Sequence, residues 1–584
     1  MRFIYPATLA TALAIAGFCA CGSSSADTTP AGTSISSKPR QLGVADTVTG
    51  PRVANLHNPL PSLPRPLVLS GNFGELRNNH FHSGLDFKTG GRTGIKVVSA
   101  DSGYVSRVTV SPWGFGRAVY VAHPRTGLTT VYGHLEAFAP KIDKRAKDEQ
   151  YRRESFNLDM EFAPGELPVS RGETIGLSGN SGSSGGPHLH MDVRHTATGD
   201  AVDPMPYFSG IITDNVAPRV RSIGVYAVDG EGHTGTPSSV AAGAAEPSFS
   251  AWGRIYPAIK AYDHMTSTSN IYGVKHMSLE VDGKEVYRRT IDRFSFSDTR
   301  AVHTLVDYPT LRKSGSWMMV TKVPESDPLF YMIDAENSGI LEINSERRYK
   351  CAFVLEDAFG NRTRAPFIII GKKAEIKPAA TQGRIARYNH DFIFKGKGMD
   401  VTIPEGALYE NLDFTHSITH SDRYISPIHS ICDATVPLHK AVTITVDVPS
   451  GHCADTDKYV LVRVGATKRG GDVAVDARYE NGRMTAKVTN LGRYAVTTDT
   501  TAPKIRKAKR KLGYIISDNL SGIATYRGEI DGKFALFEYD GKNALLSYTP
   551  DGKRFPRDGK EHEVVIYVTD AAGNSAEFVD TVTF

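Results

Sequence analysis

The sequence predicts an all-β protein of several domains, and three observations support this. From residue 67 to about 208, short apolar runs alternate with glycine-rich turns, as in KVVSA (96–100) and AVYVA (118–122). Beyond residue 208, Asp-Gly and Gly-Asn pairs separate alternating apolar runs, which indicates hairpins. Three short segments of this second region also occur twice, in the same order. We therefore expect one β domain followed by three β-sandwich-like domains.

The size and composition are those of an ordinary globular protein. A chain of 584 residues has room for roughly four domains. Its apolar content of 40% and charged content of 22% allow each domain to bury a core. The 68 basic and 63 acidic residues nearly balance, and no basic run is interleaved with aromatic residues. Nucleic acid is therefore not an expected partner.

The N-terminus predicts export. Arg2 precedes an apolar stretch over residues 7–16, which is too short to span a bilayer. The segment GFCACGSSS that follows it resembles a bacterial lipoprotein cleavage site with Cys21 as the acylated residue. We expect a signal peptide over 1–21 and a periplasm-facing lipoprotein of the cell envelope, anchored by acyl chains on Cys21. The alternative is cleavage and release. Residues 22–66, rich in Ser, Thr, Pro and Gly, predict a flexible linker.

The remaining chain divides into four predicted domains. They cover residues 67–210, 211–375, 376–498 and 499–584. The second and fourth share three repeated segments: DNVAPRV (214–220) with DTTAPKI (499–505), VDGK (281–284) with IDGK (530–533), and DAFGN (357–361) with DAAGN (570–574). These segments resemble immunoglobulin-like modules of bacterial envelope proteins. Their expected role is that of a spacer or a binding surface.

The cysteines are not candidates for metal binding, because none lies in a CxxC motif. Three remain after residue 21: Cys351, Cys432 and Cys453. In an exported protein Cys432 and Cys453 could form a disulfide that closes a loop of 22 residues, leaving Cys351 unpaired.

Two histidines lie side by side in the segment HLHMDVR (188–194), where polar and apolar residues alternate strictly. This is the period of a half-buried strand. The apolar members are expected to face the core. His188 and His190 face the other way, together with Asp192. Two adjacent histidines on an outward face indicate a functional site.

A second cluster lies in HSGLD (82–86), where His82 and Asp86 share a face whether the backbone is extended or helical. With one further histidine they form the His₂Asp set of catalytic zinc sites, which leaves a fourth position for water. His134 follows a predicted strand on which Thr130, Tyr132 and His134 share a face. It is the expected partner of whichever histidine of the 188/190 pair does not bind the metal.

Four motifs together resemble the lysostaphin/LytM-type murein endopeptidases. They are HxxxD (82–86), YGH (132–134), GLSGNSG (176–182) and GPHLH (186–190), and the resemblance covers about residues 67–208. It implies an open antiparallel β-sheet groove (the duplicated hybrid motif) with one Zn²⁺. The implied zinc ligands are His82, Asp86 and His190. The implied catalytic residues are His134 and His188, and the implied partner is the peptide stem of peptidoglycan.

The chain departs from this pattern in two places. A densely charged insertion of helical composition, at about 140–160, follows His134; it either caps the site or is a solvated helix. The segment before His82 lacks a Tyr that some members use to stabilise the oxyanion. Arg77 is a candidate replacement, whereas Asn79 contacts the substrate or simply forms a turn. Asn180, in the glycine-rich groove wall, is a further candidate substrate contact.

The sequence thus favours an exported zinc metalloendopeptidase that hydrolyses peptidoglycan cross-links through metal-activated water. One alternative is a non-catalytic LytM-type scaffold or activator of other wall hydrolases. Another is an adhesin or wall-binding protein that carries a vestigial enzyme.

Overall fold

The computed structural model describes residues 55–208, 210–228, 238–239, 246–376, 381–451, 455–467, 469–550 and 552–584. The predicted signal peptide, the acylation site Cys21, most of the predicted linker and Cys453 lie outside these residues. The last part of that linker is described, and there Leu56 and Leu60 are buried in the core. The expected flexibility therefore does not extend to this segment. Within the described ranges no helix is both long and apolar enough to cross a membrane.

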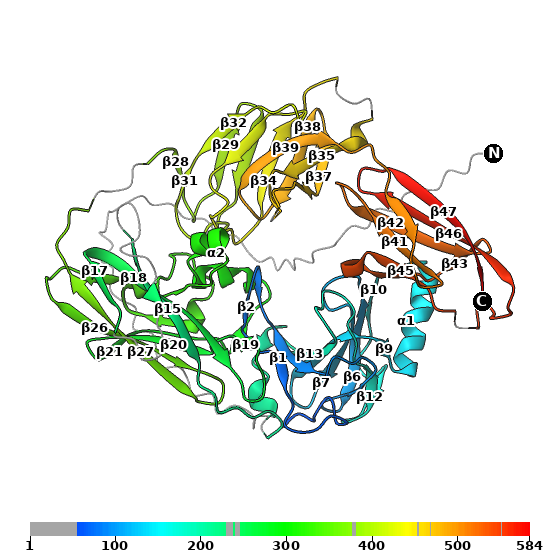
Figure 1. Cartoon of the computed structure of the whole chain (residues 1–584), viewed down its shortest axis with the longest axis horizontal. Coiled ribbons are helices and arrows are strands. Elements are labelled where there is room, and N and C mark those ends of the chain that lie inside the picture. The colour runs from blue at the N-terminus through cyan, green and yellow to red at the C-terminus, as the bar shows by residue number, and fades with distance from the viewer. Residues whose placement is uncertain are drawn as a thin grey trace, which may run out of the picture. The chain divides into compact units, whose positions relative to one another are not determined.

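The all-β prediction is confirmed (Figure 1). The region 67–210 forms an open antiparallel sheet in the order β1 (Leu69–Gly71), β4 (Gly84–Lys88), β13 (His188–His195), β8 (Leu128–Leu135), β7 (Arg117–His123), β6 (Gly103–Val110) and β10 (Leu158–Glu161). A smaller sheet contains β5 (Lys96–Val98), β12 (Thr174–Leu177) and β9 (Ala137–Phe138).

Strand β13 lies between β4 and β8, and this order brings three sequence motifs together. His190 pairs with Asp86 on one side and with Gly133 on the other. Leu189, on the opposite face, is fully buried in the core as predicted. The face that carries His190 is also buried, since Asp192 is 0% exposed. The strand is therefore covered on both faces, where the alternation predicted a half-buried one.

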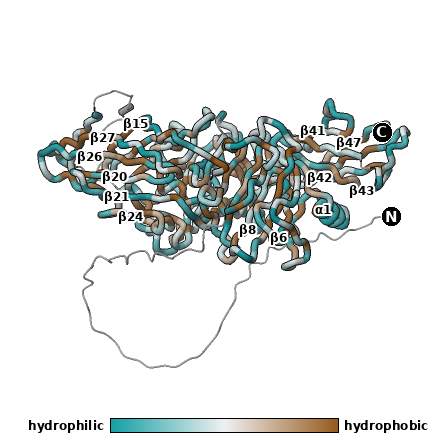
Figure 2. The backbone as a smooth tube through the Cα atoms, turned by 90° about the horizontal axis from the view of Figure 1, so that it is seen from below, coloured by the Kyte–Doolittle hydropathy of each residue, from teal (hydrophilic) through white to brown (hydrophobic). Residues whose placement is uncertain are grey.

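The charged insertion forms helix α1 (Pro140–Arg152), as its composition predicted. Pro140 occupies the first turn, where its missing N–H has no helical partner to lose. Ile142, Ala146 and Gln150 recur every four residues and form the buried face. The rest of the helix is hydrophilic, as Figure 2 shows. This arrangement supports the solvated helix over the cap.

The regions 211–375 and 499–584 share one pattern of strand pairing. In the first, β15 (Arg219–Ala227) pairs with β18 (Gly253–His264), and a facing sheet contains β21 (Lys284–Thr290), β20 (His276–Val281), β26 (Arg348–Glu356) and β27 (Arg362–Gly371). In the second, β40 (Lys504–Lys507) pairs with β41 (Gly513–Ser517), and the facing sheet is β43 (Lys533–Ala535), β42 (Ile523–Ile530), β46 (Glu561–Asp570) and β47 (Ser575–Thr583).

The repeated Asp-Gly pair forms the same turn in both regions. Asp282 and Gly283 have φ values of 51° and 84°, and Asp531 and Gly532 have 49° and 71°. Two successive residues with positive φ are the signature of the tight type I′ hairpin turn, which favours Asp-Gly. The repeat seen in the sequence is thus a repeat of structure. The immunoglobulin-like assignment itself stays a prediction.

Between these two regions, residues 384–498 form two further five-stranded sheets. The first contains β29 (Phe392–Gly396), β30 (Met399–Ile403), β34 (Val442–Asp447), β38 (Arg483–Val488) and β37 (Ala477–Glu480). The second contains β32 (His416–Thr419), β33 (Ile428–Ile431), β39 (Gly492–Thr498), β35 (Tyr459–Arg463) and β36 (Val473–Val475). Their apolar side chains form one shared core.

The first β domain and the region after it share a sheet. Strand β14 (Ala201–Val202) pairs with β13 on one side and with β22 (Arg293–Phe294) on the other. Phe294 is fully buried, and its ring lies 5.1 Å from the Phe73 ring and 5.0 Å from the Phe81 ring. The segment that leads into the site is thus packed against a strand from the next region.

Candidate metal centre

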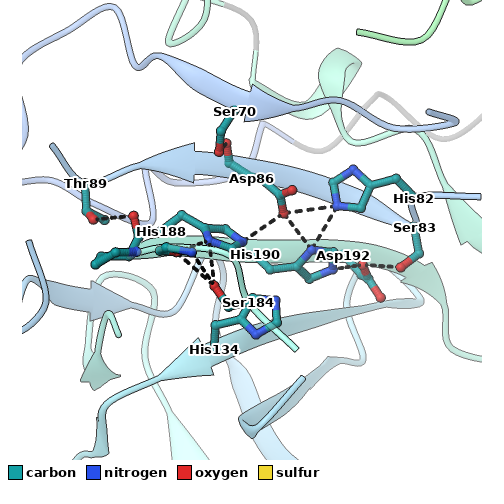
Figure 3. Close-up of polar contacts among 12 residues, drawn as sticks. Ser70, His82, Ser83, Asp86, Thr89, His134, Ser184, His188, His190 and Asp192 are labelled. Atoms are coloured by element: carbon teal, nitrogen blue, oxygen red, sulfur yellow. Dashed lines mark hydrogen bonds and ion pairs between the residues drawn. The ribbon is translucent and has the colours of Figure 1, made fainter. Parts of the chain in front are cut away.

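Three side chains converge at the middle of the main sheet (Figure 3). His82 Nε2 lies 3.0 Å from Asp86 Oδ1 and 3.0 Å from His190 Nδ1, and His190 Nδ1 lies 2.8 Å from Asp86 Oδ1. All three residues are buried, with exposures of 2%, 6% and 3%. His82 precedes β4, Asp86 lies on β4, and His190 lies opposite it on β13.

The three donors suit zinc. Two imidazole nitrogens and one carboxylate oxygen form a set typical of catalytic zinc sites. A tetrahedral ion with bonds of about 2.1 Å holds its donors about 3.4 Å apart. The observed separations of 2.8 to 3.0 Å are slightly shorter, so the side chains need to move apart by only a few tenths of an ångström.

Each of the two histidines has its other ring nitrogen occupied. His82 Nδ1 lies 2.7 Å from the backbone oxygen of Asn72, to which it donates. His190 Nε2 lies 2.6 Å from Asp192 Oδ1, to which it likewise donates. When each ring is neutral, its proton sits on the far nitrogen, and the near nitrogen can offer its lone pair to a metal. This is how ligand histidines are oriented around metals in general.

Asp192 is the residue whose role sequence reasoning missed. The alternation placed it on the face of His190 but gave it no function. It is completely buried, and it accepts hydrogen bonds from Ser83 Oγ at 2.9 Å and from Arg194 Nε at 3.0 Å. The spacing of two between His190 and Asp192 on one strand could have predicted the contact.

His190 and Asp192 each stabilise the charged form of the other. Burial opposes ionisation of Asp192, but Arg194 and His190 lower its pKa to about 2. Burial likewise opposes a charge on His190, yet Asp192 and Asp86 raise the pKa of His190 to about 9. In the metal-free protein His190 therefore carries a proton that a metal ion would have to displace.

Gly84 allows strands β4 and β13 to lie close enough for their side chains to meet. A Cβ atom on Gly84 would lie 2.2 Å from the backbone oxygen of Met191 and 2.7 Å from Asp192 Oδ1. Any other residue would push β4 away from β13. The glycine in HSGLD is thus required for the close approach of the two strands that carry the ligands.

Asp86 is held from the opposite side by Arg77. Arg77 Nη2 donates to Asp86 Oδ2 at 3.0 Å, which leaves Oδ1 facing the histidines. Burial opposes ionisation of Asp86, but His82, His188 and His190 hold its pKa well below 3.8. Asp86 is therefore a carboxylate at neutral pH.

The other two predicted substrate contacts differ in their placement. Asn79 is exposed on the turn between β2 (Leu76–Arg77) and β3 (His80–Phe81). Asn180 is partly buried in the loop beside His134, and its Oδ1 atom is buried without a hydrogen-bond partner among the described residues. Of the two, Asn180 is the one that adjoins Ser181, whose backbone oxygen holds His134.

His134 and His188 lie beside the three candidate ligands. Their ring centroids are 4.8 Å apart, and His188 Nε2 lies 3.4 Å from Asp86 Oδ1. His188 Nδ1 donates to the Gly186 oxygen at 2.8 Å, and His134 Nδ1 donates to the Ser181 oxygen at 2.8 Å. Each neutral ring therefore carries its proton on Nδ1 and has a free lone pair on Nε2.

His134 reaches the site because its strand contains a bulge. Gly133 lies opposite His190, so alternation would turn the next side chain toward the core. His134 instead has a φ of 58°, at a register shift between β7 and β8. The prediction that His134 shares a face with Tyr132 is wrong, because Tyr132 is buried in the core. An extra residue that re-aims a side chain is a common feature of active sites.

The environment keeps His134 uncharged. Burial lowers the pKa of His134 to about 3, and the neighbouring His190 and His188 add to this effect. The ring is therefore neutral over the physiological range.

The glycine-rich loop that supports His134 is contacted from the C-terminal region. Lys542 Nζ donates to the backbone oxygen of Asn180 and, at 3.2 Å, to that of Gly182. Ser181, between them, accepts the His134 hydrogen bond. The position of His134 thus depends on a loop to which residue 542 is hydrogen-bonded.

Comparisons with known proteins agree with this site. Over 124 residues, 21% of this chain, it is 32% identical to an uncharacterized metalloprotease of Haemophilus influenzae and 31% identical to the DD-carboxypeptidase/endopeptidase Mpg of Neisseria meningitidis serogroup B. These stretches are 20% and 22% of the two relatives, so the chain spans about a fifth of their length.

Two further comparisons concern a solved structure and a family model. A mutant catalytic domain of the prophage-encoded M23 protein EnpA from Enterococcus faecalis is 25% identical, over 25% of this chain and 94% of that one, with a TM-score of 0.18. A family model described as a Zu5-like domain matches residues 383–499. The resemblance to LytM-type metallopeptidases is thus confirmed for one domain of the chain.

Proposed function

We propose that this chain is a zinc endopeptidase that hydrolyses peptide cross-links in peptidoglycan. One observation carries the proposal: two imidazole nitrogens and a carboxylate oxygen meet within 3.0 Å, and each imidazole is oriented by an acceptor on its far nitrogen. A vestigial site would have no reason to keep both the donors and their supports.

In this proposal His82, Asp86 and His190 hold the metal. When bound, zinc supplies Lewis acidity toward the amide carbonyl and toward water. Asp86 contributes one negative charge and keeps its orientation through Arg77. Arg77 is therefore proposed as a positioning residue that acts through Asp86, rather than as the oxyanion-stabilising group that the sequence suggested.

His188 and His134 are proposed as the catalytic residues. With its proton on Nδ1, each ring can accept a proton from water at Nε2 and return it to the leaving amine. The low pKa of His134 favours its neutral form at the start of the reaction. We propose Asn180 as a substrate contact because it lies in the loop that supports His134; its Oδ1 is buried and would have to be uncovered to meet a substrate amide. Asn79 is proposed only as a turn residue.

The substrate and the location rest on different support. Peptidoglycan peptide stems are proposed from the sequence resemblance and from the printed name of the Neisseria relative. Export, and anchoring to the cell envelope through an acylated Cys21, are proposed from the N-terminal sequence. Labelling of the wild-type chain, but not of Cys21→Ala, with a radioactive fatty acid tests the anchor.

The enzyme is tested with the full mature chain and purified cross-linked peptidoglycan. The wild type is expected to bind one zinc at this site and to release muropeptides with cleaved cross-links. His190→Ala is expected to lose both properties, because it removes a ligand. His134→Ala is expected to keep zinc but lose release. His80→Ala, which changes an exposed histidine nearby, is the matched control.

A different result identifies the alternative function. If the wild type binds zinc with full occupancy but releases no fragments, alone or with wall hydrolases present, the proposal fails. If it then increases fragment release by another hydrolase, the scaffold or activator function replaces it.

A further inference from the structure

A second cluster of potential metal ligands lies in the region 211–375 and shares no residue with the cluster of His82, Asp86 and His190. Asp214 precedes β15, Asp263 lies near the end of β18, and Asp357 follows β26. One carboxylate oxygen from each lies within 4.8 Å of the other two. Asp263 is 4% exposed and Asp357 is 2% exposed. Three carboxylates thus meet in a mostly buried position.

One carboxylate oxygen of Asp263 has no structural partner that explains its burial. Its Oδ1 atom is buried and has no hydrogen-bond partner among the described residues, and the same holds for Asp214 Oδ2. None of the ion pairs formed by the described residues includes any member of this triad. Burial, followed by the charges of Asp357 and Asp214, raises the pKa of Asp263 to about 8. An unpaired buried carboxylate is costly unless a cation balances it.

The other oxygens of the triad hold turns. Asp357 accepts hydrogen bonds from the backbone of Phe359 and from the backbone and side chain of Asn361. Asp214 Oδ1 accepts from Thr266. Turn formation therefore accounts for these contacts, but it leaves the free oxygens of Asp214 and Asp263 unexplained.

The region 499–584 contains the same arrangement. Asp499 precedes β40, Asp518 follows β41, and Asp570 ends β46. Their carboxylate oxygens also lie within 4.8 Å of one another, and Asp518 Oδ1 is again buried without a partner among the described residues. The sequence repeat already aligns Asp499 with Asp214 and Asp570 with Asp357. The correspondence of Asp518 with Asp263 is visible only in the structure.

Such a triad matches the requirements of a hard divalent cation. Calcium binds six to eight oxygens at about 2.3–2.6 Å, so two oxygens on one ion lie at most about 5 Å apart. The observed limit of 4.8 Å meets this condition in both regions. Carboxylates without nitrogen or sulfur donors favour calcium over zinc.

We propose that each of the two regions binds one calcium-like divalent cation, through Asp214, Asp263 and Asp357 in the first and through Asp499, Asp518 and Asp570 in the second. The ion joins the segment that enters each region to the ends of two of its strands. It would stiffen each region at the point where the chain enters it.

The test uses the full mature chain, stripped of metal with a chelator and then titrated with Ca²⁺ by calorimetry. We expect two sites that zinc does not fill, with dissociation constants of about 10⁻⁴–10⁻³ M, as is usual for extracellular modules. Asp263→Asn should remove one site, Asp518→Asn the other, and the double variant both. His190→Ala should keep both, since it alters only the zinc site. Asp159→Asn, at an exposed aspartate, is the control.

Thermal unfolding distinguishes a cation site from a purely structural cluster. Without calcium, at a pH above about 8, where the Asp263 carboxyl is ionised, Asp263→Asn should raise the melting temperature, because it removes a repelled charge, and calcium should add less to it than to the wild type. A purely structural role predicts an equal or lower melting temperature for the variant. The proposal is overturned if the wild type binds no Ca²⁺ at millimolar concentration, or if both substitutions leave the stoichiometry unchanged.

Discussion

The Nε2 atom of His190 lies 2.6 Å from Oδ1 of Asp192, two residues further along the same strand. Asp192 has no exposed surface, and it fixes which nitrogen of His190 faces Asp86. The strand therefore supplies both a candidate metal ligand and the group that orients it.

Replacing Asp192 should weaken metal binding without removing any ligand. We expect Asp192→Asn to lower zinc affinity by about 10-fold and Asp192→Ala by about 100-fold, the range known for residues that support ligand histidines. Affinity is measured by competition with a chromogenic chelator at pH 7.5. Asp159→Asn, at an exposed aspartate, should leave it unchanged. Equal affinities for wild type and Asp192→Ala would show that His190 does not depend on this contact.

Removing the His134 ring should separate metal binding from turnover. We expect kcat of His134→Ala to fall about 10²–10⁴-fold, the usual contribution of a general acid–base residue, while zinc content stays at the wild-type value. Fragment release and metal content are measured on the same preparation. Loss of zinc in this variant would mean that His134 is a ligand and would require a new assignment.

As the pH falls, catalytic activity should decrease in parallel with the amount of bound zinc. Because burial lowers the pKa of His134 to about 3, this ring stays neutral through pH 5. Protons instead compete with zinc for His190, whose pKa in the metal-free protein is raised to about 9. Activity and bound zinc, measured between pH 5 and pH 8, should therefore decline together as the pH falls. A fall in activity at constant zinc content would contradict this explanation.

His303 should make folding stability depend on pH. It is 1% exposed, its Nε2 lies 2.6 Å from the Asn78 oxygen, and burial lowers its pKa to about 4. The neutral ring is favoured in the folded state, so the stabilisation is complete above about pH 6.5 and is lost as the pH falls toward 4. The loss is of the order of 3 kcal/mol.

Denaturant unfolding at pH 7.5 and pH 5 measures this effect. The fall in unfolding free energy between the two values should be smaller in His303→Gln than in the wild type, because glutamine does not titrate. An identical fall in both proteins would assign the pH dependence to other groups.

The sequence was sufficient where a pattern is local. Strict alternation in 188–194 identified the strand, and the Asp-Gly pairs at 282–283 and 531–532 identified two hairpins. The resemblance to the LytM-type family, rather than any local pattern, implied which histidines meet. The strand and the two hairpins depend on neighbouring residues, whose chemistry restricts the backbone directly.

What the sequence could not give depends on distant residues. The bulge that re-aims His134 results from the register between β7 and β8. The burial of Asp192 follows from Ser83 and Arg194 covering its face of the strand. The meeting of Asp263 with Asp214 and Asp357 requires three strand ends to coincide. Local periodicity in the sequence does not predict such long-range contacts.

The pairing of β14 with β22 has a practical consequence for anyone who isolates the first β domain. A fragment that ends near residue 208 would leave the outer side of β14 without its partner and would uncover the pocket that Phe294 fills. Bare strand edges recruit other chains, so such a fragment should aggregate or bind its own copies. Expression to about residue 375, which also keeps β26 and β27 beside β20, would leave this edge paired, so the first β domain and the region after it behave as one folding unit.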